Sequence, residues 1–187
     1  MAIRIFIDQG HNPENPNAGA EGNGIREQDV TYAVGAELAR LLRENGNYEV
    51  MLSRNNPEEI LGNSNGESLQ ARVRAANDFG ADYFISIHAN ASDIPTASGS
   101  EAFVFNKESP AIPLAESILD SLEYATGFPR RGVYSRPTLY VLRRTKMPAA
   151  LIEIGFITNP AEAYLMQTNP GLFAAGIYNG IRNYFGN

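Results

Sequence analysis

The chain has 187 residues, of which 43% are hydrophobic and 19% charged, and its formal net charge at pH 7 is -6. This length and composition are typical of one globular domain with a full core, and they exclude a disordered or fibrous protein. The acidic balance argues against nucleic-acid binding, because phosphate contacts require a surplus of Lys and Arg. The absence of cysteine excludes disulfides, thiolate metal sites and a cysteine nucleophile.

No segment of the chain approaches about 20 consecutive apolar residues, so we expect no membrane-spanning helix. The N-terminal residues enter an apolar run almost at once and lack the pattern of a signal peptide. Two locations agree with this pattern: inside the cell, or outside it as a domain excised from a longer exported chain.

Apolar residues follow alternating strand-like and helix-like spacings along the chain. In chain order, we predict a strand at 3–8, a helix at 27–45, a strand at 48–53, a helix at 69–79, strands at 81–88 and 101–105, a helix at 111–126, strands at 139–142 and 149–154, and a helix at 170–185. The interleaving predicts a single α/β domain over 1–187. We expect a mostly parallel twisted sheet of about six strands, with helices on both faces.

The only two histidines of the chain each follow a strand-like apolar run. His11 ends the first such run, and His88 ends the run that begins at Tyr83. Ligands and catalytic groups gather outside the carboxyl ends of strands in open α/β sheets. We therefore expect the two imidazoles to meet in one crevice.

Two glutamates are candidate partners for these histidines. Glu27 lies at the start of a predicted helix, and Glu153 follows four apolar residues, 149–152. Two histidines and one carboxylate around an open position are a known catalytic zinc arrangement. Burying Glu153 is costly unless it has a partner or a chemical role, which makes it a candidate general base.

Each of these residues also has a purely structural interpretation. A single histidine in a strand is more often a satisfied core residue than a ligand, and Glu27 would complement a helix dipole. Glu153 would be a salt-bridged structural carboxylate. For each residue alone, the structural interpretation is the better one. For the whole set it is less convincing, because both histidines follow buried strands.

Six distinctive segments occur in order over nearly the whole chain: IFIDQGH (5–11), GIREQD (24–29), SRNN (53–56), ARVRAAN (71–77), FISIHANA (84–91) and MPAALIEIGFITN (147–159). This set resembles the zinc-dependent N-acetylmuramoyl-L-alanine amidases of bacterial cell walls. The resemblance implies that His11, Glu27 and His88 are Zn²⁺ ligands and that Glu153 is the catalytic carboxylate. It also implies a single α/β domain that hydrolyses the amide between N-acetylmuramic acid and L-alanine.

The resemblance further implies peptidoglycan as the partner. We also expect no nucleic-acid partner, no membrane span and a monomeric protein. The implied location is extracellular or in the cell wall, either as an excised domain or through an export signal outside this chain. The loop at the first ligand differs from the usual family pattern of Pro followed by Gly-His-Gly-Gly, because this chain has Gln9-Gly10-His11-Asn12-Pro13.

A basic cluster interrupts the acidic chain, and its members are Arg130, Arg131, Arg136, Arg143, Arg144 and Lys146. A charge run is usually a solvated face. The alternative is that some of these side chains bind stem-peptide carboxylates, since Arg binds carboxylate bidentately. Arg143 and Arg144, which precede the run to Glu153, and Asn90, two residues after His88, are the predicted substrate contacts.

Two other function classes remain open from the residues. One is a different zinc peptidase acting on cell-wall peptides, with the same ligands and a differently shaped pocket. The other is a non-catalytic wall-binding module, which is disfavoured because both histidines and both glutamates are in place.

Overall fold

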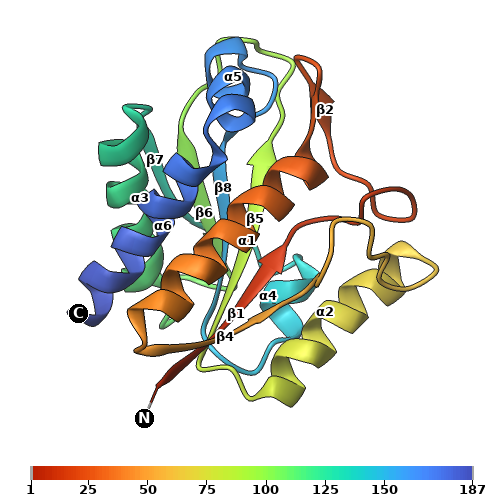
Figure 1. Cartoon of the computed structure of the whole chain (residues 1–187), viewed down its shortest axis with the longest axis vertical. Coiled ribbons are helices and arrows are strands. Elements are labelled where there is room, and N and C mark those ends of the chain that lie inside the picture. The colour runs from red at the N-terminus through yellow and green to blue at the C-terminus, as the bar shows by residue number, and fades with distance from the viewer. Residues whose placement is uncertain (1, 187) are drawn as a thin grey trace.

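A six-stranded sheet forms the centre of the computed structural model, which describes residues 2–186 (Figure 1). Its strand order is β4-β1-β5-β8-β6-β7. The strands are β1 (Ile3–Gln9), β4 (Tyr48–Leu52), β5 (Tyr83–Asn90), β6 (Ser100–Val104), β7 (Arg130–Ser135) and β8 (Ala149–Phe156). The β6–β8 pairing is antiparallel, and the other four pairings of this sheet are parallel. Strands β2 (Glu21–Gly22) and β3 (Ile25–Arg26) form a separate two-stranded ribbon.

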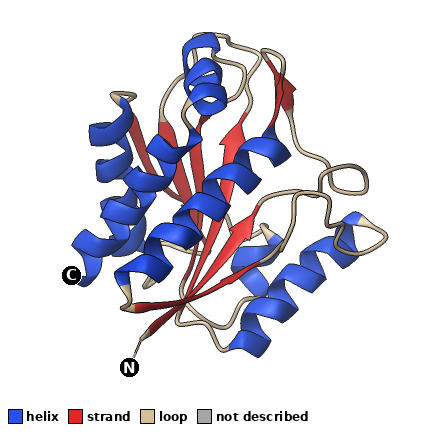
Figure 2. Ribbon diagram, in the orientation of Figure 1, coloured by secondary structure: helices blue, strands red, loops and turns tan. Residues whose placement is uncertain are grey.

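Helices cover both faces of the sheet (Figure 2). They are α1 (Glu27–Asn45), α2 (Asn65–Phe79), α3 (Ile112–Thr126), α4 (Tyr140–Arg144), α5 (Pro160–Thr168) and α6 (Pro170–Phe185). Helices α1, α3 and α6 pack into the larger part of the core, whereas α2 and α4 pack into the smaller part on the other face. Within residues 2–186, none of these helices combines the length and the apolar character needed to cross a membrane.

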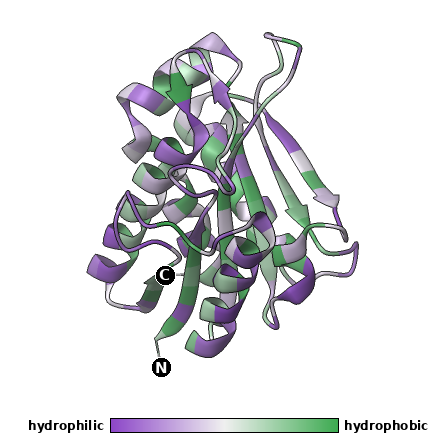
Figure 3. Ribbon diagram, turned by 90° about the vertical axis from the view of Figure 1, so that its right-hand side faces the viewer, coloured by the Kyte–Doolittle hydropathy of each residue, from purple (hydrophilic) through white to green (hydrophobic). Residues whose placement is uncertain are grey.

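The strand side chains alternate between the two parts of the core. Ile5 and Ile7 of β1 pack with the α1, α3 and α6 side, whereas Phe6 packs with the α2 and α4 side. On β8, Ile152 and Leu151 divide in the same way. Apolar residues therefore concentrate in the strands while the outer helix surfaces are hydrophilic (Figure 3). This two-sided burial explains the near-continuous apolar strands.

The fold confirms the predicted α/β class, the mostly parallel sheet and the helices on both faces. The predicted strand at 139–142 is wrong, because the short helix α4 begins at Tyr140. Val141 and Leu142 bury their side chains against the smaller core part from this helix, so an apolar run of four residues did not distinguish strand from helix. The sixth strand of the sheet is β7, which lies in the basic segment.

Helix α5 was also absent from the predicted elements, although its start carries a recognisable signal. The side chain of Asn159 accepts hydrogen bonds from the backbone amides of Ala161 and Glu162, and Pro160 occupies the first helical position. Asn as N-cap followed by Pro is a typical helix start. The short length of α5 concealed its apolar periodicity.

A close approach between α3 and α6 depends on Gly180. An ideal Cβ at this position would lie 2.5 Å from the Cα of Ile118 on α3, well inside van der Waals contact. Backbone atoms cannot move away as a flexible side chain does. The two helices can therefore pack at this separation only with glycine at position 180.

We predict that Gly180→Ala lowers the free energy of unfolding by about 1–3 kcal/mol, the usual cost of overpacking a core. Gly66→Ala is the matched control, because its Cβ would lie 4.0 Å from the nearest atom, the Ser64 hydroxyl. Urea unfolding of both variants measures the difference. Equal stability of the two variants would contradict the packing argument.

Candidate metal centre

His11 lies just beyond β1, where the backbone of this strand approaches β5 closely. The amide of Gly10 donates to the carbonyl of Ile87 at 3.0 Å, and His11 itself has a positive φ of 68°. An ideal Cβ on Gly10 would lie 2.6 Å from Cε1 of His88. Glycine at position 10 thus permits the two histidines to sit side by side, with ring centroids 4.8 Å apart.

Glu27 is the first residue of α1, and its buried carboxylate reaches both histidines. Its Oε1 lies 3.1 Å from Nε2 of His11 and 3.0 Å from Nδ1 of His88. Backbone amides fix both oxygens: Ala89 donates to Oε1 at 3.0 Å, and Ala20 donates to Oε2 at 2.9 Å. The carboxylate is therefore held in one orientation before any ligand binds.

The three side chains fit a divalent metal ion of the zinc type. Their candidate ligand atoms all lie within 4.8 Å of one another. Ligand atoms around a tetrahedral Zn²⁺ lie about 3.3 Å apart when each bond is about 2.0–2.1 Å. Imidazole nitrogens and a carboxylate oxygen are also ligands that zinc accepts. The site thus has suitable donors at suitable separations.

The electrostatics keep Glu27 ionised. Burial alone would raise the pKa of this carboxyl, but its hydrogen bonds to His11 and His88 and their charges outweigh burial and lower the pKa. A carboxylate that is ionised at neutral pH is ready to bind a cation without first losing a proton.

A buried arginine of α2 ties the end of β1 in place. Nη1 of Arg72 donates to Oδ1 of Asp8 at 2.6 Å and to the carbonyl of Gln9 at 2.6 Å, and Nη2 donates to the carbonyl of His11 at 2.5 Å. Ser86 of β5 donates to the other oxygen of Asp8 at 2.7 Å. This network joins β1, β5 and α2 directly beneath the metal centre.

Glu153 lies beside His88, because these two residues are partners in the β5–β8 register. Its Oε2 is buried and has no hydrogen-bond partner among the described residues. Burial raises the pKa of this carboxyl well above its usual range, and the charges of Glu27 and Glu101 raise it further. A buried carboxyl with a raised pKa next to candidate metal ligands is typical of a group that exchanges protons.

The metal centre and Glu153 open into a cavity of about 440 Å³, and the residues that line it include Asn90, Glu101, Phe103 and Arg136. The side chain of Asn90 donates to Glu101 at 2.8 Å. Of the predicted substrate contacts, Asn90 therefore lies in this cavity.

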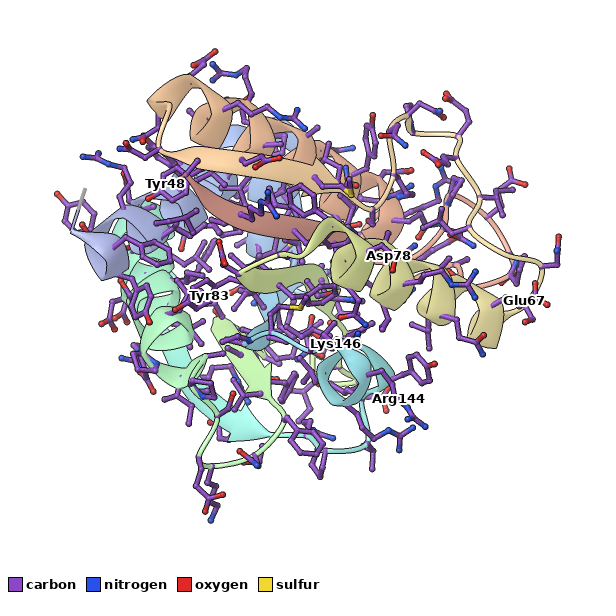
Figure 4. The ribbon with its side chains drawn as sticks, turned by 90° about the horizontal axis from the view of Figure 1, so that it is seen from below. Tyr48, Glu67, Asp78, Tyr83, Arg144 and Lys146 are labelled. Atoms are coloured by element: carbon purple, nitrogen blue, oxygen red, sulfur yellow. The ribbon has the colours of Figure 1, made fainter. Side chains whose placement is uncertain are left out.

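The structure places the other two predicted contacts elsewhere. Arg143 and Arg144 are exposed at the end of α4, where each guanidinium lies near the ring of Tyr140. Arg143 lines a different hollow together with Lys146. Figure 4 shows Arg144 and Lys146 beside α4 from the lower side of Figure 1. Neither arginine is among the described residues that line the cavity of the metal centre, and their role in substrate binding stays a prediction.

Two residues of the site escaped sequence reasoning as functional positions: Asp8 and Arg72. Arg72 carries a signal, because it lies three residues after Leu69 and four before Ala76, on the apolar stripe of its helix. A charged residue on a buried helix face needs a partner. The sequence could therefore have indicated that Arg72 has a partner. It could not have identified that partner, Asp8, which lies 64 positions away.

Comparisons with known proteins identify the family of the chain. A profile of the N-acetylmuramoyl-L-alanine amidase family matches residues 5–183. The germination-specific N-acetylmuramoyl-L-alanine amidase of Bacillus subtilis is 33% identical over 97% of this chain and 79% of its own length. The chain belongs to the N-acetylmuramoyl-L-alanine amidase family.

Solved structures of amidases share the whole fold. The N-acetylmuramoyl-L-alanine amidase from Clostridium difficile 630 has 30% identity and a TM-score of 0.87 over 100% of this chain and 98% of its own. The CwlD amidase from Clostridioides difficile, solved in complex with the GerS lipoprotein, has 26% identity and a TM-score of 0.89 over 98% of each chain.

We predict that the Asp8–Arg72 pair makes stability depend on acid pH. Burial raises the pKa of Asp8, but the charge of Arg72 and the hydrogen bonds of Ser86 and Arg72 lower it overall. A lowered folded pKa contributes stability above the unfolded pKa of about 3.9, and this contribution is lost as pH falls through the folded pKa. Asp8→Asn should therefore destabilise by about 3 kcal/mol at pH 7.

The difference between wild type and Asp8→Asn should narrow as pH falls below about 4, because protonated Asp8 leaves Arg72 as unpaired as the amide does. Urea unfolding of both proteins at pH 7, 4 and 2.5 measures this difference in the free energy of unfolding. The other carboxyls titrate alike in both proteins, so their contributions cancel in the difference between the two stabilities. A difference that stays constant over this range would show that the pair does not contribute through ionisation.

Proposed function

We propose that this chain hydrolyses the amide between the lactyl group of N-acetylmuramic acid and L-alanine in peptidoglycan. Its metal would be Zn²⁺, held by His11, Glu27 and His88. Family membership supports the reaction class. The observation that carries the proposal is the convergence of three ligand atoms within 4.8 Å of one another, beside a buried carboxyl, Glu153, that lines the same cavity.

The protein's own groups prepare the site for this reaction. When bound, Zn²⁺ supplies a Lewis acid that polarises an amide carbonyl and lowers the pKa of water. The amides of Ala89 and Ala20 hold Glu27 in its ligand orientation, and Arg72 holds the backbone of His11. These contacts reduce the reorganisation needed when metal and substrate bind.

Glu153 is the proposed proton carrier. It would accept the proton of the attacking water and deliver it to the nitrogen of the departing L-alanine. Acid–base catalysis of this kind contributes on the order of 10²–10⁴-fold to rate. The position of Glu153 next to His88, with a buried Oε2 that has no hydrogen-bond partner among the described residues, supports this role.

We also propose that the protein acts at the cell wall or outside the cell, where this substrate lies, and that it acts as a monomer. The acidic charge of the chain supports a partner other than nucleic acid. The family to which the chain belongs is named for the N-acetylmuramoyl-L-alanine amide, a linkage of peptidoglycan. The role of Asn90 in substrate binding belongs to this proposal, because its side chain lies in the cavity.

We predict that Glu153→Gln retains zinc but loses on the order of 10²–10⁴-fold in kcat, since the amide cannot carry a proton. The measurement is the release of new L-alanine amino termini from peptidoglycan, with zinc content determined on the same sample. Intact glycan with new L-alanine termini supports the amidase. New amino termini on other residues would instead indicate a peptidase, and full activity in Glu153→Gln would remove this residue from catalysis.

We predict that His88→Ala weakens zinc binding by more than about 100-fold, beyond the loss from changing a group that merely supports a ligand. The chain has no cysteine and only two histidines, so no third imidazole can substitute. Competition with a chromogenic chelator measures the affinity without any activity assay. Tight zinc binding in His88→Ala would refute the proposed ligand set.

A further inference from the structure

The cavity of the metal centre extends over one face of β8 and β6. Glu153 and Leu151 of β8 line it, as do Glu101 and Phe103 of β6. The antiparallel register pairs Glu101 with Glu153 and Phe103 with Leu151, so these four side chains form adjacent rows. A substrate bound at the metal centre would lie along this surface.

Carboxylates dominate the charges that line the cavity. Glu27, Glu101 and Glu153 all contribute, and among the described residues Arg136 is the one Arg or Lys in the lining. Glu101 is already paired, because Nε of Arg131 donates to it at 3.0 Å and Asn90 donates at 2.8 Å. Beside the proposed metal ion, Arg136 therefore supplies the side-chain positive charge that this cavity offers to a ligand.

Arg136 is held in place without a partner for its charge. Its backbone amide donates to the carbonyl of Val104 at 2.8 Å, and the following Pro137 restricts its backbone. The guanidinium carbon lies 4.8 Å from the ring centroid of Phe103. Within residues 2–186, the structure gives this side chain neither a hydrogen bond nor an ion pair. Its donors are thus oriented by the aromatic ring and remain available.

We propose that Arg136 binds the free carboxylate of the residue that follows L-alanine in the stem peptide and makes the enzyme selective for it. This inference rests on the proposed amidase function. A planar guanidinium matches a carboxylate through two parallel hydrogen bonds. The carboxylate on the residue after L-alanine is the anionic group closest to the scissile amide.

The test uses two N-acetylmuramoyl tripeptides that differ in one group. The second residue is D-isoglutamate in one and D-isoglutamine in the other, and the terminal carboxyl is amidated in both. Zinc-loaded wild type should cleave the acid with a kcat/KM about 10- to 100-fold above that of the amide, the range for hydrogen bonds between charged groups. Most of the difference should lie in KM, because Arg136 binds away from the reacting atoms.

Arg136→Gln should reduce the preference to less than about 3-fold, whereas Arg136→Lys should retain an intermediate preference, because the charge remains but the fork is lost. Arg74→Gln is the matched control. Arg74 is an exposed arginine of α2 outside the described lining of this cavity, and its substitution removes the same charge. This control should keep the full preference. Circular dichroism of each variant establishes that it is folded.

An unchanged preference in folded Arg136→Gln would overturn the inference, as would an equal loss in Arg74→Gln. Equal cleavage of both tripeptides by wild type would also overturn it while leaving the amidase function intact. Failure of the zinc-loaded wild type to cleave either tripeptide would overturn the proposed function itself, and this inference with it.

Discussion

The candidate metal centre depends on a buried ion pair that lies beneath it. The guanidinium of Arg72 donates hydrogen bonds to Asp8 of β1 and to the carbonyl of His11, just beyond that strand. Both partners are almost completely buried, where an unpaired charge would be strongly unfavourable. Folding of the pair therefore also fixes the position of His11. His11 has a positive φ, which is uncommon for a residue other than glycine, and without the bond from Arg72 its backbone could adopt a more common conformation.

The remaining candidate ligands are placed by strand pairing and by a helix start. Parallel pairing of β1 with β5 brings both histidines to one end of the sheet, and Gly10 leaves room for the ring of His88. The ribbon of β2 and β3 leads directly into α1, whose first residue, Glu27, faces both imidazoles. Each ligand comes from a different element, which means that the site exists only in the folded protein.

The sequence contained much of this arrangement. Apolar runs ending at His11 and His88 placed both residues at strand ends, and Glu153 was marked by the apolar residues before it. Their chemical roles came from the resemblance of ordered motifs. The pairing of Arg72 with Asp8 could not be predicted, because it joins residues far apart in the chain. The position of Arg136 beside the site could not be predicted either. Strand β7, which precedes it, was not predicted, and the direction of β6 follows from long-range pairing.

In the proposed site, His11, Glu27 and His88 bind one metal ion together. The most direct measurement is a crystal structure of the zinc-loaded protein with anomalous diffraction data on both sides of the zinc absorption edge. We expect one strong anomalous peak, about 2.0–2.2 Å from Nε2 of His11, Nδ1 of His88 and a carboxylate oxygen of Glu27. A peak that lacks any one of these ligands, or no peak between them, would contradict it.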